Sequence, residues 1–205
     1  MKNKSHELKQ KVAREAAVLL YFGSEKEYKQ AKLKAAENLG AHFLPSNRDI
    51  ALELNSIVHE NEGTTRKQRL VQMRQEANKI MTLMKACDPV LIGSVWRGTI
   101  RRGSDIDIAL FYDQPDEIVN ILAKSKVEIV KTEWNSVTKQ GKTETSFHIL
   151  IETTMKNRVE LVVRNRDEFE RKRKCEIFGD ELRGLNLKEI AKVLIENPTV
   201  QFLPG

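Results

Sequence analysis

Over the first 88 residues, hydrophobic positions recur every three or four residues. Apolar residues at this spacing share one face of a helix, so the pattern predicts amphipathic helices. Four are expected, at about 5–22, 24–39, 46–62 and 64–86. Ser24 followed by Glu27 predicts a capping box at the second helix. Short loops between amphipathic helices favour an antiparallel helical bundle, which we assign as an N-terminal helical domain over residues 1–88.

From Asp88 onwards the pattern changes to short apolar runs with two-residue alternation, which is typical of strands. The predicted strands are 90–92, 106–112, 127–134, 145–153 and 158–164, and two further helices are expected at 115–124 and 187–196. The last two strands predict a hairpin around residues 155–157. We therefore expect a second domain over residues 89–205, with a C-terminal helix.

The composition is that of an ordinary globular protein. The 205 residues carry a formal net charge of +6 with a pI near 9.3, which favours polyanionic partners such as nucleotides or nucleic acid. The sequence contains no run of 18 apolar residues, so no membrane span is expected. Cys87 and Cys175 have no metal-ligand spacing, and two isolated thiols suit a reducing cytoplasm. The apolar C-terminal tail is expected to dock on something, and it is compatible with a homodimer.

The candidate metal-binding and phosphate-binding residues lie in the stretch 91–112. Asp105 and Asp107 flank Ile106, so a strand would place both carboxylates on one face. Two carboxylates that close together repel each other, and an oxygen-preferring dication such as Mg²⁺ would relieve the repulsion. Upstream, Gly93 and Ser94 form a turn in which backbone N–H groups and a hydroxyl can approach phosphate oxygens. The pattern therefore indicates a nucleoside triphosphate site.

A basic insert separates these two motifs. Arg97, Arg101 and Arg102 are placed to meet triphosphate oxygens, which suit the forked donors of arginine. The alternative is an ordinary solvated loop. Trp96 either packs in the core or stacks on a base.

The motif as a whole resembles the signature of the DNA polymerase β-like nucleotidyltransferase superfamily, especially the minimal nucleotidyltransferases and archaeal CCA-adding enzymes. The matching residues are Gly93, Ser94, Arg97, Gly98, Ser104, Asp105 and Asp107. The pair Val95-Trp96 departs from the family, which often has an aromatic followed by a small residue. The resemblance covers about 89–165. It implies an α+β protein in which the helical bundle precedes a mixed sheet flanked by helices.

The resemblance also implies roles for these residues in an enzyme that transfers a nucleotidyl group. Asp105, Asp107 and a third carboxylate on a later strand would be catalytic and would hold two Mg²⁺ ions. We assign the third carboxylate to Glu160, with Glu152 as the alternative. The nucleoside triphosphate would be bound by Gly93, Ser94, Arg97, Arg102 and Ser104. His148 is interpreted as a sheet residue with a satisfied ring and without a catalytic role.

The acceptor of the transferred group stays open. Residues 1–88 hold sixteen Lys or Arg and eleven Asp or Glu, and this excess, with basic residues such as Arg66 and Arg74 in the fourth predicted helix, favours RNA, tRNA above all. Few aromatics are present for base stacking. The alternatives are a partner protein or a small molecule as acceptor, and a non-catalytic RNA-binding protein. The run 171–174 is either an acceptor contact or a solvated surface.

Overall fold

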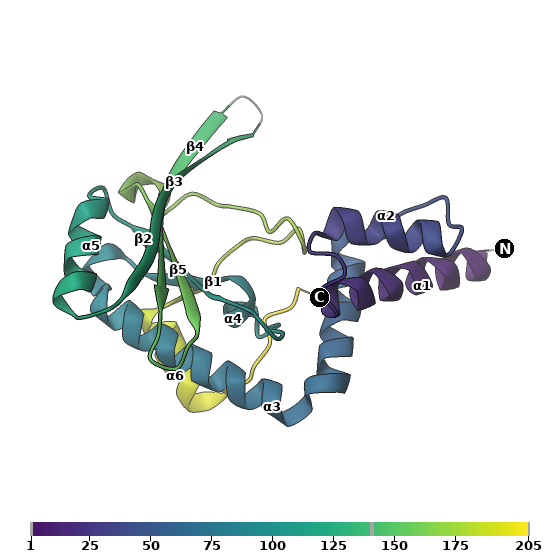
Figure 1. Ribbon diagram of the computed structural model, residues 1–205, viewed down its shortest axis with the longest axis horizontal. Coiled ribbons are helices and arrows are strands. Elements are labelled where there is room, and N and C mark those ends of the chain that lie inside the picture. The colour runs from purple at the N-terminus through teal and green to yellow at the C-terminus, as the bar shows by residue number, and fades with distance from the viewer. Residues whose placement is uncertain (1, 140–141, 205) are drawn as a thin grey trace. The chain divides into compact units, whose positions relative to one another are not determined.

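The computed structural model describes residues 2–139 and 142–204 (Figure 1). The chain divides into two compact units. One contains the residues up to Arg66 together with Lys174–Glu181 and Pro204, and the other contains Lys67–Arg173 and Leu182–Leu203. The domain boundary expected between residues 88 and 89 stays a prediction. Within the described residues, no helix is both long enough and apolar enough to cross a membrane.

The first unit is built from α1 (Lys2–Tyr21), α2 (Tyr28–Asn38) and the first part of α3 (Asn47–Leu83). Small side chains such as Ala16 and Ala35 fill its core, which lets the helices approach closely. The predicted capping box at Ser24 is wrong, because α2 begins at Tyr28 and its N-cap makes no side-chain hydrogen bond.

The third and fourth predicted helices form one element, α3, with a kink at Gly63 (φ 45°, ψ −123°). The later part of α3 corrects the bundle interpretation. Its apolar stripe lies in the core of the second unit, with the sheet. The stripe contains Leu70, Met73, Ala77, Met81 and Met84. Periodicity predicted the helix, but it could not show which partner the apolar face would pack against.

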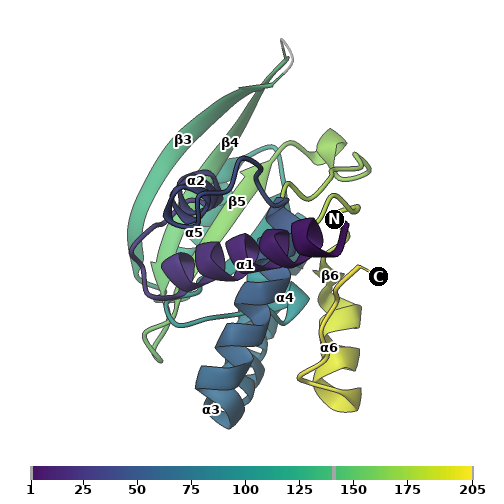
Figure 2. The ribbon, with the colours of Figure 1, turned by 90° about the vertical axis from the view of Figure 1, so that its right-hand side faces the viewer.

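The second unit contains a six-stranded sheet in the order β3-β4-β5-β2-β1-β6. The strands are β1 (Val90–Ile92), β2 (Ile106–Phe111), β3 (Ile129–Lys139), β4 (Lys142–Glu152), β5 (Arg158–Arg164) and β6 (Leu185–Asn186). Among the described strands, only the pairing of β2 with β5 is parallel. β3 and β4 run side by side along their length (Figure 2). The predicted α+β class, with N-terminal helices followed by a mixed sheet, is confirmed. The short β6 was not predicted.

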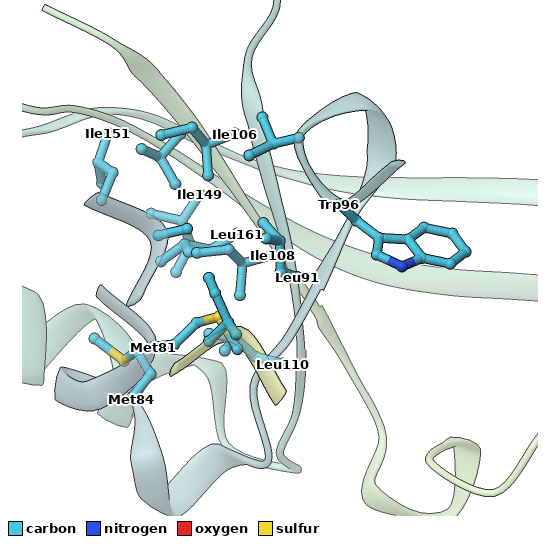
Figure 3. Close-up of a cluster of buried hydrophobic side chains, with 14 of the residues drawn as sticks. Met81, Met84, Leu91, Trp96, Ile106, Ile108, Leu110, Ile149, Ile151 and Leu161 are labelled. Carbon is cyan, nitrogen blue, oxygen red and sulfur yellow. The ribbon is translucent and has the colours of Figure 1, made fainter. Parts of the chain in front are cut away.

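The remaining helices of this unit are α4 (Gly93–Arg97), α5 (Pro115–Lys124) and α6 (Leu187–Glu196), with 3₁₀ turns η1 (Lys85–Cys87) and η2 (Arg166–Glu168). One sheet face is packed in the core (Figure 3). On β2, Ile106, Ile108 and Leu110 are fully buried there. The two-residue alternation therefore turns the residues between them to the other face.

A buried arginine fastens the C-terminal segment to this unit. The Arg74 guanidinium, 0% exposed, donates to the carbonyl oxygens of Val95, Trp96, Pro198 and Val200 at 2.8–3.1 Å. Burial lowers the pKa of Arg74 to about 10. The apolar tail thus docks on its own chain, through carbonyl groups that the guanidinium satisfies.

Burial excludes two basic residues of α3 from contact with an acceptor. Arg66 is 4% exposed and donates to the Asn55 side chain at 2.5 Å, and Arg74 is engaged as described. The expectation that these two residues belong to an RNA-facing surface is therefore wrong, because a phosphate cannot reach a guanidinium enclosed by protein.

Candidate active site

The pairing of β2 with β5 brings two of the predicted carboxylates together. Asp107 on β2 is in parallel register with Glu160 on β5, and neighbouring strands lie about 4.8 Å apart. Both side chains leave the sheet on the face opposite the buried Ile108 and Leu161. Asp105 lies one residue before the start of β2. The start of these two strands therefore gathers the acidic groups.

Burial and the neighbouring carboxylates raise the pKa of both aspartates. The pKa of Asp107 is raised to about 7, first by burial and then by the charges of Glu160 and Asp105. Burial also raises the pKa of Asp105, with Glu160 adding to the effect and Arg158 opposing it. Like charges and desolvation both disfavour the ionised form. The site therefore holds negative charge that the protein alone does not balance.

Gly93 shapes the site through the absence of a side chain. Its φ of +70° suits glycine, and a Cβ atom there would lie 1.9 Å from Oδ2 of Asp107. Strand pairing explains the proximity, because Ile92 is opposite Asp107 on β1. Ser94 follows within the first turn of α4 and is partly exposed. The predicted phosphate-binding turn and the predicted acidic pair are thus in direct contact.

The other predicted nucleotide-binding residues have different surroundings. Arg97 is 4% exposed, lies over the Trp96 ring and donates to the carbonyl oxygen of Phe202 at 3.0 Å. These contacts indicate a structural role for Arg97, and its phosphate role stays a prediction. Trp96 packs in the core. Ser104 accepts from the Arg101 N–H at 2.9 Å and closes the loop before Asp105.

Arg102 lies in the same loop and is exposed. Its side chain is therefore accessible to solvent, and its contact with a nucleotide stays a prediction.

The two candidates for the third carboxylate occupy different places. Glu160 is in register with Asp107, whereas Glu152 lies at the end of β4 and forms an ion pair with Lys156 at 2.7 Å. Glu160 influences the pKa of both aspartates. The geometry therefore supports Glu160.

His148 lies on β4 with both ring nitrogens hydrogen-bonded, but the sequence interpretation did not identify Glu160 as its partner. Its Nδ1 lies 2.6 Å from Oε1 of Glu160, and its Nε2 lies 2.8 Å from Oγ of Ser146. An ionised carboxylate only accepts hydrogen bonds, so Nδ1 donates to Glu160, and in a neutral imidazole Nε2 then accepts from the serine hydroxyl. The chain from Ser146 through His148 holds one oxygen of Glu160. Only the register of β4 on β5, in which Leu150 is opposite Glu160, could have revealed that His148 reaches Glu160.

The donor set fits a hard dication. Asp105, Asp107 and Glu160 offer only carboxylate oxygens, the ligands that Mg²⁺ prefers, and their mutual repulsion would fall if a cation lay between them. In the part of the chain that the structure describes, no three His, Cys, Asp or Glu side chains form a ready coordination group. The identity and number of metal ions stay predictions.

Comparisons with known proteins place the chain in a family. The family model described as nucleotidyltransferase domain matches residues 88–196, which is more than half of the chain. No curated protein sequence matches the chain significantly.

Three solved structures are similar to part of the chain. A cytoplasmic RNA terminal U-transferase is 14% identical over 58% of this chain, with a TM-score of 0.30. The GLD-2/RNP-8 complex is 15% identical over 60%, with a TM-score of 0.33. The Cid1 poly(U) polymerase with MgGTP is 14% identical over 59%, with a TM-score of 0.29. The matched parts span 35%, 44% and 39% of those chains, less than half of each.

The family match covers the turn at Gly93, the acidic pair and Glu160. The predicted resemblance to the polymerase β-like superfamily, and with it the class of nucleotidyltransferase, is confirmed. The predicted homodimer and cytoplasmic location stay predictions. The chain belongs to the nucleotidyltransferase domain family.

Proposed function

We propose that this protein transfers a nucleoside monophosphate from a nucleoside triphosphate to an acceptor hydroxyl carried by RNA. The observation that supports this most is the register of Asp107 with Glu160, beside a glycine turn that touches the Asp107 carboxylate. In such a site the carboxylates can bind a cation, and the backbone N–H groups of the glycine turn can bind phosphate oxygens.

Each residue has a distinct role in this proposal. Gly93 and Ser94 bind the β- and γ-phosphates, because the turn exposes backbone N–H groups where no Cβ obstructs the approach. Asp105, Asp107 and Glu160 would hold Mg²⁺, which when bound supplies charge to stabilise the attacking and leaving oxygens of an in-line displacement. Glu160 orients the acceptor hydroxyl, and His148 fixes the Glu160 carboxylate through the 2.6 Å hydrogen bond.

The choice of RNA as acceptor rests on charge. The chain has a formal net charge of +6, and a basic protein attracts polyanions over long distances. A partner protein or a small molecule is the competing acceptor.

The test is a transfer assay with two acceptor pools. The wild-type chain and Asp107→Asn are incubated with each α-labelled nucleoside triphosphate and Mg²⁺, on total RNA and on total protein in parallel. We expect label in RNA from the wild type and a loss on the order of 100-fold in the variant, equivalent to about 2.7 kcal/mol of transition-state stabilisation.

Glu152→Gln is the matched control, because this carboxylate lies on the neighbouring strand and is paired with Lys156. It should label RNA at close to the wild-type rate. Label in protein would move the acceptor assignment to a partner protein. Equal labelling by wild type and Asp107→Asn would refute the proposed site.

A further inference from the structure

A cavity lies over the same sheet face as the carboxylates. Its volume is about 340 Å³, and its floor includes Ile92, Val90, Ala109 and Phe111. Ala109 follows Asp107 by two positions and is opposite Val90, so it shares the Asp107 face. Two residues along a strand correspond to about 7 Å. The cavity therefore begins within one nucleotide's reach of the carboxylates.

Arginine dominates the charged walls of this cavity. The charged residues that line it are Arg164, Arg171, Arg173, Arg183 and Glu189. The Glu189 carboxylate is engaged, because it accepts from the Asn186 N–H at 2.8 Å in the cap of α6. The cavity thus presents more guanidinium groups than carboxylates to a ligand.

Behind the walls, two glutamates hold three of these arginines. Arg171 pairs with Glu144 at 2.7 Å, and Arg173 pairs with Glu168. Arg164 lies 4.0 Å from Glu144 and 3.8 Å from Glu168. Burial lowers the pKa of Arg164, the charges of Arg173 and Arg171 lower it further, and Glu168 and Glu144 oppose this effect. The glutamates therefore leave positive charge unbalanced.

The fourth arginine stands apart from this network. Among the described residues, no carboxylate lies within ion-pair distance of Arg183, and its side chain is exposed. Its segment is held close to β1, because a Cβ on the next residue, Gly184, would lie 2.4 Å from Cγ1 of Val90. Arg183 is therefore a cavity-lining donor whose loss should leave the fold intact.

The remaining walls suit an aromatic base. Phe169 lines the cavity, is 45% exposed and contacts Phe111 edge to face at 5.1 Å between ring centroids. Exposed aromatic rings beside arginines form sites for single-stranded nucleic acid, since bases stack on the rings and phosphates pair with guanidinium groups.

We propose that this arginine pocket binds the terminal nucleotide of a single-stranded RNA acceptor. The inference rests on the proposed function and specifies where the acceptor lies. Gly93 follows Ile92, which is opposite Asp107 and lines one end of the pocket floor. The rest of the floor on β1 and β2 lies away from Gly93, at Val90, Ala109 and Phe111. An in-line displacement requires the attacking and leaving oxygens on opposite sides of the phosphorus atom. An acceptor in the pocket faces a triphosphate at the glycine turn in this way.

The test compares binding of two probes to the full chain. The affinities of a short fluorescein-labelled single-stranded RNA and of ATP are measured with Mg²⁺ for the wild type, Arg183→Gln and Arg183→Lys. We expect Arg183→Gln to weaken RNA binding about tenfold, equivalent to about 1.4 kcal/mol, and to leave ATP binding unchanged. The RNA affinity of Arg183→Lys should lie between those of the wild type and Arg183→Gln, because lysine keeps the positive charge but lacks the forked hydrogen-bond donors of arginine.

Lys192→Gln on α6 is the matched control, since it removes one exposed positive charge outside the pocket. An equal loss in both variants, or no loss in either, would overturn the proposal. A loss of ATP affinity alone would place the donor nucleotide in the pocket and also overturn it.

The binding and transfer assays together distinguish a failure of the pocket assignment from a failure of the proposed function. If Arg183→Gln loses RNA affinity while the wild type transfers no label, the proposed function fails and the pocket assignment stands. If Arg183→Gln labels RNA with an unchanged KM, the pocket assignment fails and the proposed function stands.

Discussion

The two faces of the sheet differ sharply along the same strands. On one face, Ile106, Ile108 and Leu161 are fully buried in a continuous apolar core (Figure 3). On the other face, Asp107 and Glu160 lie side by side with unbalanced negative charge. Alternation at period two allows one strand to stabilise the fold with half of its residues and to carry chemistry with the rest. The stabilising and destabilising residues are therefore neighbours in sequence.

The largest stability effect should come from the apolar face. Ile108→Ala removes a fully buried side chain from the centre of β2, and such truncations cost about 2–5 kcal/mol through lost burial and the cavity left behind. We expect a clear fall in the midpoint of urea unfolding. A change below about 1 kcal/mol would mean that the core collapses around the cavity.

A neighbouring substitution on the polar face should stabilise the protein instead of destabilising it. The pKa of Asp107 is raised to about 7 in the folded protein, so its ionisation opposes folding. This penalty is absent below the unfolded pKa near 3.9, grows as the pH rises, and is complete above about pH 7. Asp107→Asn should therefore stabilise the metal-free protein at pH 8, at roughly 1.4 kcal/mol per pKa unit removed.

Thermal unfolding at pH 5 and pH 8 measures this difference. The stabilisation by Asp107→Asn should shrink at the lower pH, and a constant difference would contradict the raised pKa. Adding Mg²⁺ should raise the Tm of the wild type and have little effect on Asp107→Asn, because ligands that bind the folded state stabilise it.

The smallest effect concerns a residue that acts through another. His148→Ala frees one oxygen of Glu160 without removing the carboxylate. We expect kcat to fall about tenfold, equivalent to about 1.4 kcal/mol, with the KM for the nucleoside triphosphate unchanged. Ser146→Ala, one hydrogen bond further from Glu160, should have a smaller effect. A rise in KM with unchanged kcat would assign His148 to substrate binding.

Local patterns in the sequence were enough to predict most elements of the second unit. The strands 90–92 and 158–164 and the helices 115–124 and 187–196 have the predicted bounds. The acidic pair was also readable, because Asp105, Ile106 and Asp107 are adjacent and alternation fixes their faces. The motif from Gly93 to Asp107 also resembled the signature of the superfamily, and the family match confirms that resemblance.

What the sequence could not provide were relations between distant segments. The stripe of α3 around Met81 was expected in a bundle and lies in the sheet core instead, because periodicity identifies an apolar face but not its partner. Glu160 and Glu152 have similar apolar neighbours, and only the register of β2 on β5 distinguishes them.

The same limit applies to the polar residues that complete the site. His148 reaches Glu160 across a strand pair, and Arg74 satisfies carbonyl groups more than 100 positions away at Pro198 and Val200. The sequence by itself determined which residues carry charge and which face of each element they occupy, since these depend on backbone geometry within a few residues. The tertiary structure alone decided which faces meet, because strand order and helix packing depend on the burial of the whole chain.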